Sequence, residues 1–302
     1  MKISFFFKDA KPLSQLLGLF LIFLACSLIA MPLALLPDLV KPAGEVGSAR
    51  LQLVAEGLVQ LVGFLLTAWL FAKLFFLNPR QALGFHAEGR HWALGLVGIV
   101  IIVLLIPATD WLSAWNESWT FGALEESMRK TSTKLNAKML QLLAPATAGD
   151  LLLQLLVMAA IPALCEEILF RGALQPILQS LVRNSHVGIL LAAVIFSLAH
   201  GDMYGFVPRL LLGLLLGYFF WTTGSIAVSA CAHFANNAVV VVACHCYNNG
   251  ALALNPFEPI GLPWTLTLGC TIGAILLFYL YFVKKPRQAS GNPDSAPSET
   301  EG

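Results

Sequence analysis

The sequence contains eight apolar stretches that are long enough, or almost long enough, to cross a lipid bilayer as helices. They lie at 13–36, 51–77, 92–109, 150–182, 187–200, 207–221, 225–246 and 263–283. A helix needs about 20 apolar residues to cross the hydrocarbon core, where every backbone polar group must be paired within the chain. We therefore predict an all-α, polytopic membrane protein with about eight transmembrane helices, of which the fifth and sixth are short.

The composition agrees with a chain whose main solvent is lipid. Only 12% of the 302 residues are charged, whereas about 25% is usual in a soluble domain. The formal net charge of +1 gives no sign of a nucleic-acid partner. Six cysteines lie in or beside apolar stretches without a Cys-x-x-Cys pair, so we expect small buried side chains rather than disulfides or a zinc site.

The basic N-terminus leads into the stretch 13–36, which exceeds the roughly 7–15 apolar residues of a signal peptide and indicates a retained helix. With eight spans and an internal N-terminus, ten Lys and Arg residues face the cytoplasm and seven face outward. This asymmetry favours two cytoplasmic termini. We expect a multi-pass integral protein of the plasma (inner) membrane.

The chain is expected to have five parts. Three transmembrane helices occupy 1–110, a polar or amphipathic connector occupies 111–149, a core with polar clusters occupies 150–248, the last transmembrane helix lies in 249–283, and a disordered tail occupies 284–302. The connector has mixed charges at helical spacing, which favours an interfacial amphipathic helix, although a solvated connector fits as well. Pro162 predicts a bend one turn before Glu166.

Three polar clusters interrupt the apolar core, at 165–171, 196–200 and 233–237. A charged residue at the centre of a membrane helix costs about 2.5–3.5 kcal/mol on insertion scales. Retention of such groups in three successive stretches indicates that the protein uses them.

In the first cluster, Glu167 and Arg171 are four residues apart and share a helix face, with the acid in the favourable N-terminal position. We expect them to form a structural ion pair. Glu166 points elsewhere and is the carboxylate left free to act. The alternative is that all three charges pair with other helices or line a pore.

His200 ends its stretch and is either an ordinary polar helix end or a base that helps Glu166 to hold a water. His233 and Asn237 share a helix face, where they can polarise a carbonyl and hold an oxyanion. They can also act as two metal ligands or as an interhelical hydrogen-bond pair. Asn236 is expected to point away from Asn237 and to make a packing contact.

Together the three clusters resemble the signature of the CPBP family, which includes the type II CAAX prenyl endopeptidases and the Abi or bacteriocin-immunity proteins. The resemblance covers about 150–248. The motifs are Glu-Glu-x-x-x-Arg, Phe-x-x-x-His and His-x-x-x-Asn, here Glu166, Glu167 and Arg171, then Phe196 and His200, then His233 and Asn237.

The resemblance implies an intramembrane endopeptidase that hydrolyses a peptide bond in a membrane-associated, lipidated or leader-bearing substrate. It implies that Glu166 is the general base with His200 as its partner, that His233 and Asn237 hold the oxyanion, and that the Glu167 pair fixes the geometry. The expected partners are membrane lipid and a peptide or protein within the membrane.

Members of the family are often labelled metalloproteases, and a catalytic zinc ion is usually bound by about three nitrogen or oxygen ligands from the protein. Glu166, His200 and His233 are the candidate ligands, although we favour a mechanism without an obligatory metal. His200 falls near one end of its stretch and His233 near the other membrane face. Their convergence therefore requires staggered or half-length helices.

Two other classes of function fit parts of the sequence. A non-proteolytic scaffold or bacteriocin-immunity-type protein would use the same fold to bind a membrane partner. A transporter would use the intramembrane charges as a proton relay, but the sequence lacks the paired half-repeats common in such folds. The identity of the substrate is not encoded in any motif that we recognise.

Overall fold

The computed structural model describes residues 7, 9–40, 45–144 and 147–284. Within these residues every regular element is helical and no strand occurs, which confirms the all-α prediction. In chain order the helices are α1 (Pro12–Ala34), α2 (Leu36–Val40), α3 (Glu45–Gln60), η1 (Leu61–Leu66), α4 (Thr67–Phe75), α5 (Pro79–Ala82), α6 (Gly89–Leu104), α7 (Ile106–Glu117), η2 (Gly122–Leu124), α8 (Glu125–Leu142), α9 (Ala148–Gln154), η3 (Leu155–Ala160), α10 (Ile161–Glu167), η4 (Ile168–Leu174), α11 (Gln175–Val182), α12 (Ser185–Ala199), η5 (Met203–Gly205), α13 (Phe206–Thr223), α14 (Ile226–Asn248), α15 (Trp264–Phe278) and η6 (Tyr279–Val283).

Seven helical runs in the described part of the chain are long and apolar enough to cross a membrane. They are Pro12–Ala34, Ala49–Phe75, Gly89–Glu117, Ala148–Val182, Met203–Thr223, Ile226–Asn248 and Trp264–Val283. The protein is therefore a multi-pass membrane protein. The sixth predicted stretch was expected to be short, and this expectation was wrong. The η5 helix and the start of α13 extend it to 21 residues.

The fifth predicted stretch forms α12, whose 15 residues make it the short apolar helix of the set. At 1.5 Å per residue it is about 22 Å long, whereas the hydrocarbon core is about 30 Å thick. The helix is shorter than the core, though not half its length, and the prediction required staggered or half-length helices for the second and third motifs to converge.

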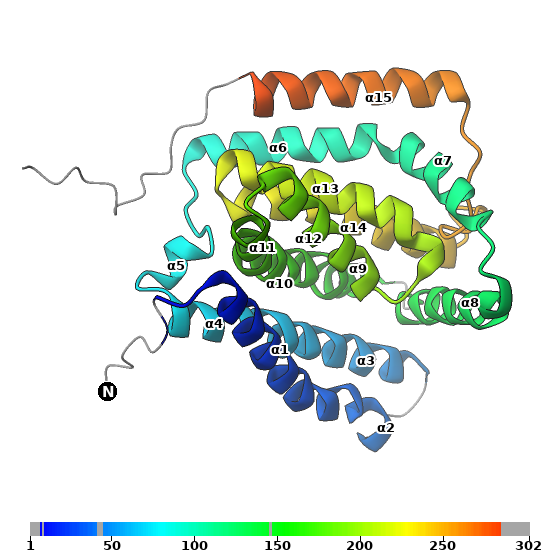
Figure 1. Cartoon of the computed structure of the whole chain (residues 1–302). Coiled ribbons are helices and arrows are strands. Elements are labelled where there is room, and N and C mark those ends of the chain that lie inside the picture. Colours follow the sequence, from blue (N-terminus) through cyan, green and yellow to red (C-terminus); the bar gives the residue numbers. More distant parts are fainter. Residues whose placement is uncertain (1–6, 8, 41–44, 145–146, 285–302) are drawn as a thin grey trace, which may run out of the picture.

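The helices that carry the polar clusters lie in the middle of the molecule (Figure 1). α10, α11, α12, α13 and α14 are flanked by α6, α7 and α15 on one side and by α1, α3 and α4 on the other. The large side chains Phe71, Ile101, Phe196 and Phe219 are fully buried in the main core between these layers. The site residues therefore sit among apolar groups drawn from both halves of the chain.

The outermost helices turn apolar side chains outward. Phe20 on α1 and Ile275 on α15 are 59% and 63% exposed. Large apolar side chains are exposed in this number only where another apolar medium covers them. The outer faces of α1 and α15 are therefore the surfaces that meet lipid.

The helix Ala148–Val182 contains two π-helical segments, η3 and η4. Pro162 stands in the first turn of α10, directly after η3. A π-helical turn is one of the ways in which a helix accommodates the missing N–H of a proline. The second π-helical segment begins directly after Glu167 and contains Arg171, and π-helical turns occur frequently at functional sites.

The polar connector contains α8, which runs from Glu125 to Leu142. Tyr204 donates its hydroxyl hydrogen to Glu125 at 2.8 Å, and Lys138 forms an ion pair with Glu56 of α3. One face of the helix is thus attached to the bundle. The predicted helix in the connector is confirmed, whereas its placement at the membrane interface stays a prediction.

The predicted disordered tail lies outside the described residues except for Lys284.

Candidate active site

The predicted pair of Glu167 and Arg171 forms in the interior of the protein. Arg171 Nε lies 3.2 Å from Glu167 Oε2, and both side chains are at most 1% exposed. The guanidinium also donates from Nη2 to the carbonyl oxygen of Gly213 at 3.3 Å and lies over the Phe196 ring, 4.7 Å from its centroid. The arginine is therefore held by α10, α12 and α13 together.

His233 lies between the two glutamates of the first motif. Its Nδ1 lies 3.0 Å from Glu167 Oε1, and its Nε2 lies 3.9 Å from Glu166 Oε2. An ionised carboxylate only accepts hydrogen bonds, so Nδ1 carries the hydrogen in the pair with Glu167. In the neutral ring Nε2 then has a lone pair that faces Glu166.

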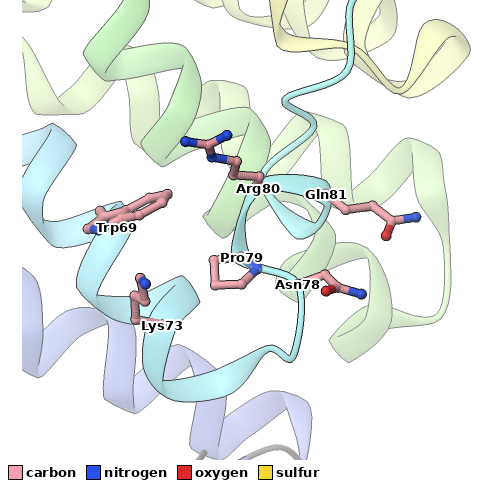
Figure 2. Close-up of a pocket in the computed structure, with 6 residues that line it drawn as sticks. All are labelled: Trp69, Lys73, Asn78, Pro79, Arg80 and Gln81. Carbon is pink, nitrogen blue, oxygen red and sulfur yellow. The ribbon is translucent and has the colours of Figure 1, made fainter. Parts of the chain in front are cut away.

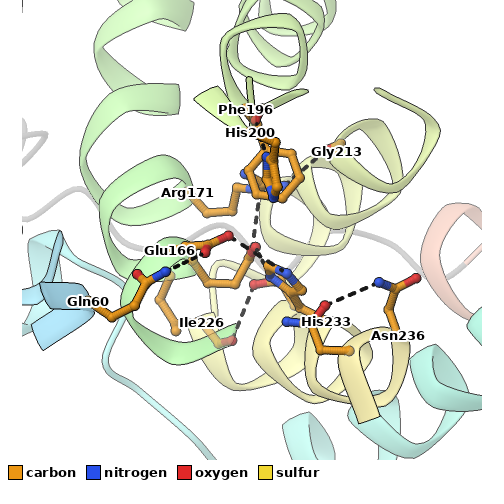
Figure 3. Close-up of polar contacts among 12 residues, drawn as sticks. Gln60, Glu166, Arg171, Phe196, His200, Gly213, Ile226, His233 and Asn236 are labelled. Atoms are coloured by element: carbon orange, nitrogen blue, oxygen red, sulfur yellow. Dashed lines mark hydrogen bonds and ion pairs between the residues drawn. The ribbon is translucent and has the colours of Figure 1, made fainter. Parts of the chain in front are cut away.

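Glu166 is 7% exposed and receives a hydrogen bond from Gln60, whose Nε2 lies 3.2 Å from Glu166 Oε1. Figure 3 shows Gln60, Glu166 and His233 converging from three different helices. The gap of 3.9 Å between Glu166 and His233 is too long for a direct hydrogen bond and is in reach of one bridging water.

Gln60 is a site residue that sequence reasoning missed. It ends α3, in the second apolar stretch, and a buried amide there is an energetic anomaly of the same kind as the three motifs. Its Oε1 is buried and has no hydrogen-bond partner among the described residues. The polar residue within an apolar stretch was the available signal, but nothing local to it indicates a contact with α10.

His200 is placed at the exposed C-terminal end of α12. Its Nδ1 lies 2.8 Å from the carbonyl oxygen of Phe196, so Nδ1 is the donor and Nε2 keeps the lone pair in the neutral ring. The Phe196 ring contacts both imidazoles, with centroids 4.9 Å from His200 and 5.6 Å from His233. Among the described residues no contact joins His200 directly to Glu166.

Asn237 does not pair with His233, and the prediction for Asn236 was wrong. Asn236 Nδ2 donates to Asn237 Oδ1 at 3.2 Å, so the two neighbouring side chains turn toward each other. Successive Cβ atoms diverge by about 100° on a helix, but the amide arms are long enough to meet. This contact occupies the oxygen of Asn237 and leaves its Nδ2 available as a donor.

A second polar contact repeats the arginine contact one turn along. Gln175 Nε2 donates to the carbonyl oxygen of Gly217 at 3.1 Å, four residues after the contact of Arg171 with Gly213. A Cβ at Gly217 would lie 2.8 Å from Ile189 and 3.0 Å from the Gln175 oxygen. Small residues at this spacing let α13 approach the helices that carry the site closely, as is typical of membrane helices.

The three candidate metal ligands are not brought together. Glu166 and His233 approach each other, whereas His200 is connected to them through Phe196 only. In the described ranges no group of three or more His, Cys, Asp or Glu side chains is arranged to hold a metal ion. The three side chains therefore do not form the candidate three-ligand zinc site in this arrangement.

The arrangement gives two proton acceptors, Glu166 Oε2 and His233 Nε2, that face each other inside a helical membrane protein. The other carboxylate, Glu167, is occupied by Arg171 and by the far side of the His233 ring. Such a site can accept both hydrogens of one water molecule and so raise its nucleophilicity.

Comparison with curated proteins and with solved structures gives no match. Among protein families, the one described as "Type II CAAX prenyl endopeptidase Rce1-like" matches residues 148–239, a range that includes all three motifs. This match confirms the resemblance drawn from those motifs. Residues 148–239, less than half of the chain, are therefore similar to the Rce1-like family of type II CAAX prenyl endopeptidases.

Proposed function

We propose that this protein is an intramembrane endopeptidase that hydrolyses a peptide bond in a membrane-associated substrate, lipidated or bearing a leader. The observation that carries the proposal is the pairing of Glu166 with His233 across a gap of 3.9 Å, next to a carboxylate already neutralised by Arg171. The family match supports a CAAX-type intramembrane protease, and seven spanning helices support a substrate in the membrane.

In the proposed mechanism Glu166 takes one proton from a bound water, and the water oxygen attacks the carbonyl carbon of the substrate. Glu166 then returns this proton to the leaving amide nitrogen as the carbon–nitrogen bond breaks. His233 Nε2 orients the same water by accepting its second hydrogen. Glu167 holds His233 in the required tautomer through Nδ1, a role familiar from carboxylate–histidine pairs.

The carbonyl oxygen becomes negative during the attack and needs a hydrogen-bond donor. Asn237 is proposed for this task, because its oxygen is held by Asn236 and its Nδ2 is left to donate. His200 stays in the proposal as a partner of the general base Glu166. Its Nε2 has a lone pair that can accept a proton, and its ring is accessible. The contact through Phe196 links it to His233.

No obligatory metal is part of this proposal, in which the water is held by Glu166 and His233. We also propose that the protein resides in the plasma (inner) membrane with both termini in the cytoplasm, an arrangement in which α12 crosses as an eighth, short span beside the seven long runs. The excess of Lys and Arg in the predicted cytoplasmic loops supports this orientation.

The test uses the purified full-length protein in lipid with a lipidated or leader-type peptide, and it measures cleavage products by mass spectrometry. Glu166→Ala is expected to abolish cleavage, whereas Glu126→Ala, which removes an exposed carboxylate on α8, leaves it unchanged. Equal cleavage by wild type and Glu166→Ala would overturn the mechanism. A cellular phenotype that survives changes at Glu166 and His200 would favour the non-proteolytic scaffold instead.

A further inference from the structure

A shallow, largely open cavity of about 490 Å³ lies at the turn between α4 and α5. None of its lining residues belongs to the candidate active site. They are Trp69, Lys73, Asn78, Pro79, Arg80 and Gln81.

Two cations and one indole ring define the inner side of this cavity. Figure 2 shows Trp69 and Lys73, both on α4, on the same side of Pro79 as Arg80, while Asn78 and Gln81 extend from the other side. The ammonium of Lys73 lies 5.2 Å from the centroid of the Trp69 ring. The aromatic ring thus holds one cation close to the cavity.

Neither cation is neutralised within the part of the chain that the structure describes. Lys73 and Arg80 are exposed, and neither makes an ion pair or a side-chain hydrogen bond with a described residue. By contrast, Arg50, Arg129, Lys138 and Arg209 each pair with a carboxylate. The cavity therefore presents two positive charges to an external anion.

The position of the cavity along the chain indicates its depth in the membrane. One spanning run ends at Phe75 and the next begins at Gly89, so the residues between them lie at a membrane boundary. This is the depth at which lipid phosphates lie. Tryptophan is enriched at the same level, because its ring is apolar and its N–H is polar.

We propose that the cavity between α4 and α5 binds the phosphate of an anionic lipid headgroup. Arg80 supplies a planar set of donors that suits two phosphate oxygens, and Lys73 supplies a compact charge. Trp69 packs beside the glycerol region of the same lipid. The inference rests on the cavity and its charges and does not depend on the proposed peptidase activity.

The test measures lipid retention by native mass spectrometry on the purified full chain. The protein is extracted from vesicles of phosphatidylcholine mixed with phosphatidylglycerol. Wild type is compared with Lys73→Gln/Arg80→Gln, and with Lys130→Gln/Lys134→Gln as a control that removes two exposed charges from α8. A further variant, Lys73→Arg, keeps the charge in the cavity.

Wild type, the α8 control and Lys73→Arg are expected to retain phosphatidylglycerol in preference to phosphatidylcholine. The cavity variant is expected to bind phosphatidylglycerol roughly 30-fold more weakly, since each basic side chain near an anionic surface strengthens attraction about fivefold. All variants should unfold at the same temperature, because the exchanged side chains are exposed.

Three results would overturn the proposal. One is equal retention of both lipids by wild type, and another is an equal loss of phosphatidylglycerol in the α8 control. The third comes from adding inorganic phosphate to detergent-purified protein. If phosphate alone protects wild type from thermal unfolding as well as phosphatidylglycerol does, and the cavity variant loses that protection, the ligand is a soluble phosphate compound and not a lipid.

Discussion

His233 Nδ1 lies 3.0 Å from Glu167 Oε1, although 66 residues separate the two in the chain. This contact joins α14 to α10 in the interior and shares the charge of Glu167 between an imidazole and the guanidinium of Arg171. Glu166 has weaker partners, namely one amide and the opposite edge of the same imidazole. The two adjacent glutamates therefore have different roles, and substitutions should distinguish the structural role of Glu167 from the catalytic role of Glu166.

Glu167→Gln is expected to destabilise the protein, because it leaves Arg171 as an uncompensated buried charge. Removing one partner of a buried ion pair costs about 3–5 kcal/mol. Glu166→Gln should leave the unfolding temperature close to that of wild type while abolishing cleavage. Thermal unfolding in detergent, followed by tryptophan fluorescence, measures the first effect. A lower unfolding temperature for Glu166→Gln than for Glu167→Gln would contradict this division.

Gln60→Ala should lower kcat and leave KM unchanged, because the amide contacts the proposed base and not the substrate. A hydrogen bond to a charged group contributes about 1.5–3 kcal/mol, which corresponds to roughly 10- to 100-fold in rate. Gln141→Ala, which removes an exposed amide on α8, is the matched control. If Gln60→Ala raises KM alone, the amide has a role in substrate binding and the positioning role is wrong.

Gly217→Ala is expected to destabilise the bundle by about 1–3 kcal/mol through overpacking. The added methyl group would meet Ile189 at 2.8 Å and the Gln175 oxygen at 3.0 Å. Gly269→Ala on α15 is the control, since nothing lies within 4 Å of a Cβ there, and it should be neutral or stabilise the helix by up to about 1 kcal/mol. Equal unfolding temperatures for the two variants would refute close packing at Gly217.

Acidification should loosen the attachment of α8 to the bundle at Glu125. The backbone N–H of Phe121 and the hydroxyl of Tyr204 hold the pKa of Glu125 below its ordinary value of 4.5. A lowered pKa in the folded state stabilises the attachment above pH 4.5, and this gain is lost as the pH falls through the lower folded value. A spin label at Lys134→Cys should therefore gain mobility in acid.

The control for this measurement is the neighbouring exposed carboxylate. Glu125→Gln should remove the acid transition, because an amide does not titrate and its oxygen can still accept from Tyr204, whereas Glu126→Gln should keep the wild-type transition. A transition that persists in Glu125→Gln would assign the acid response to another group.

Chelation should leave cleavage unchanged, because the described donor groups do not form a three-ligand set. The measurement combines elemental analysis of active protein with an assay after dialysis against a chelator. Loss of activity on chelation, with recovery on addition of zinc, would show a metal requirement and overturn the metal-free mechanism.

The features that the sequence predicted well depend on residues that are close together in the chain. The apolar stretches gave helices within a few residues of their expected bounds, except for 92–109, which continues through α7 to Glu117. Helical spacing alone placed Glu167 against Arg171. The contacts of His233 and Gln60 could not be predicted, because they depend on how distant helices pack. Asn236 was misjudged for a different reason, since helical geometry sets the direction of a Cβ but not the rotamer beyond it.

The shortness of α12 has a consequence for the lipid around it. A helix of about 22 Å in a layer of about 30 Å creates a hydrophobic mismatch, which a bilayer relieves by local thinning. The last turn of α12 is capped by N–H groups of His200 and Gly201, and the exposed imidazole of His200 lies at this end of the helix. We therefore expect a dimple in the membrane at the end of α12, through which bulk water reaches the interior where hydrolysis would consume it.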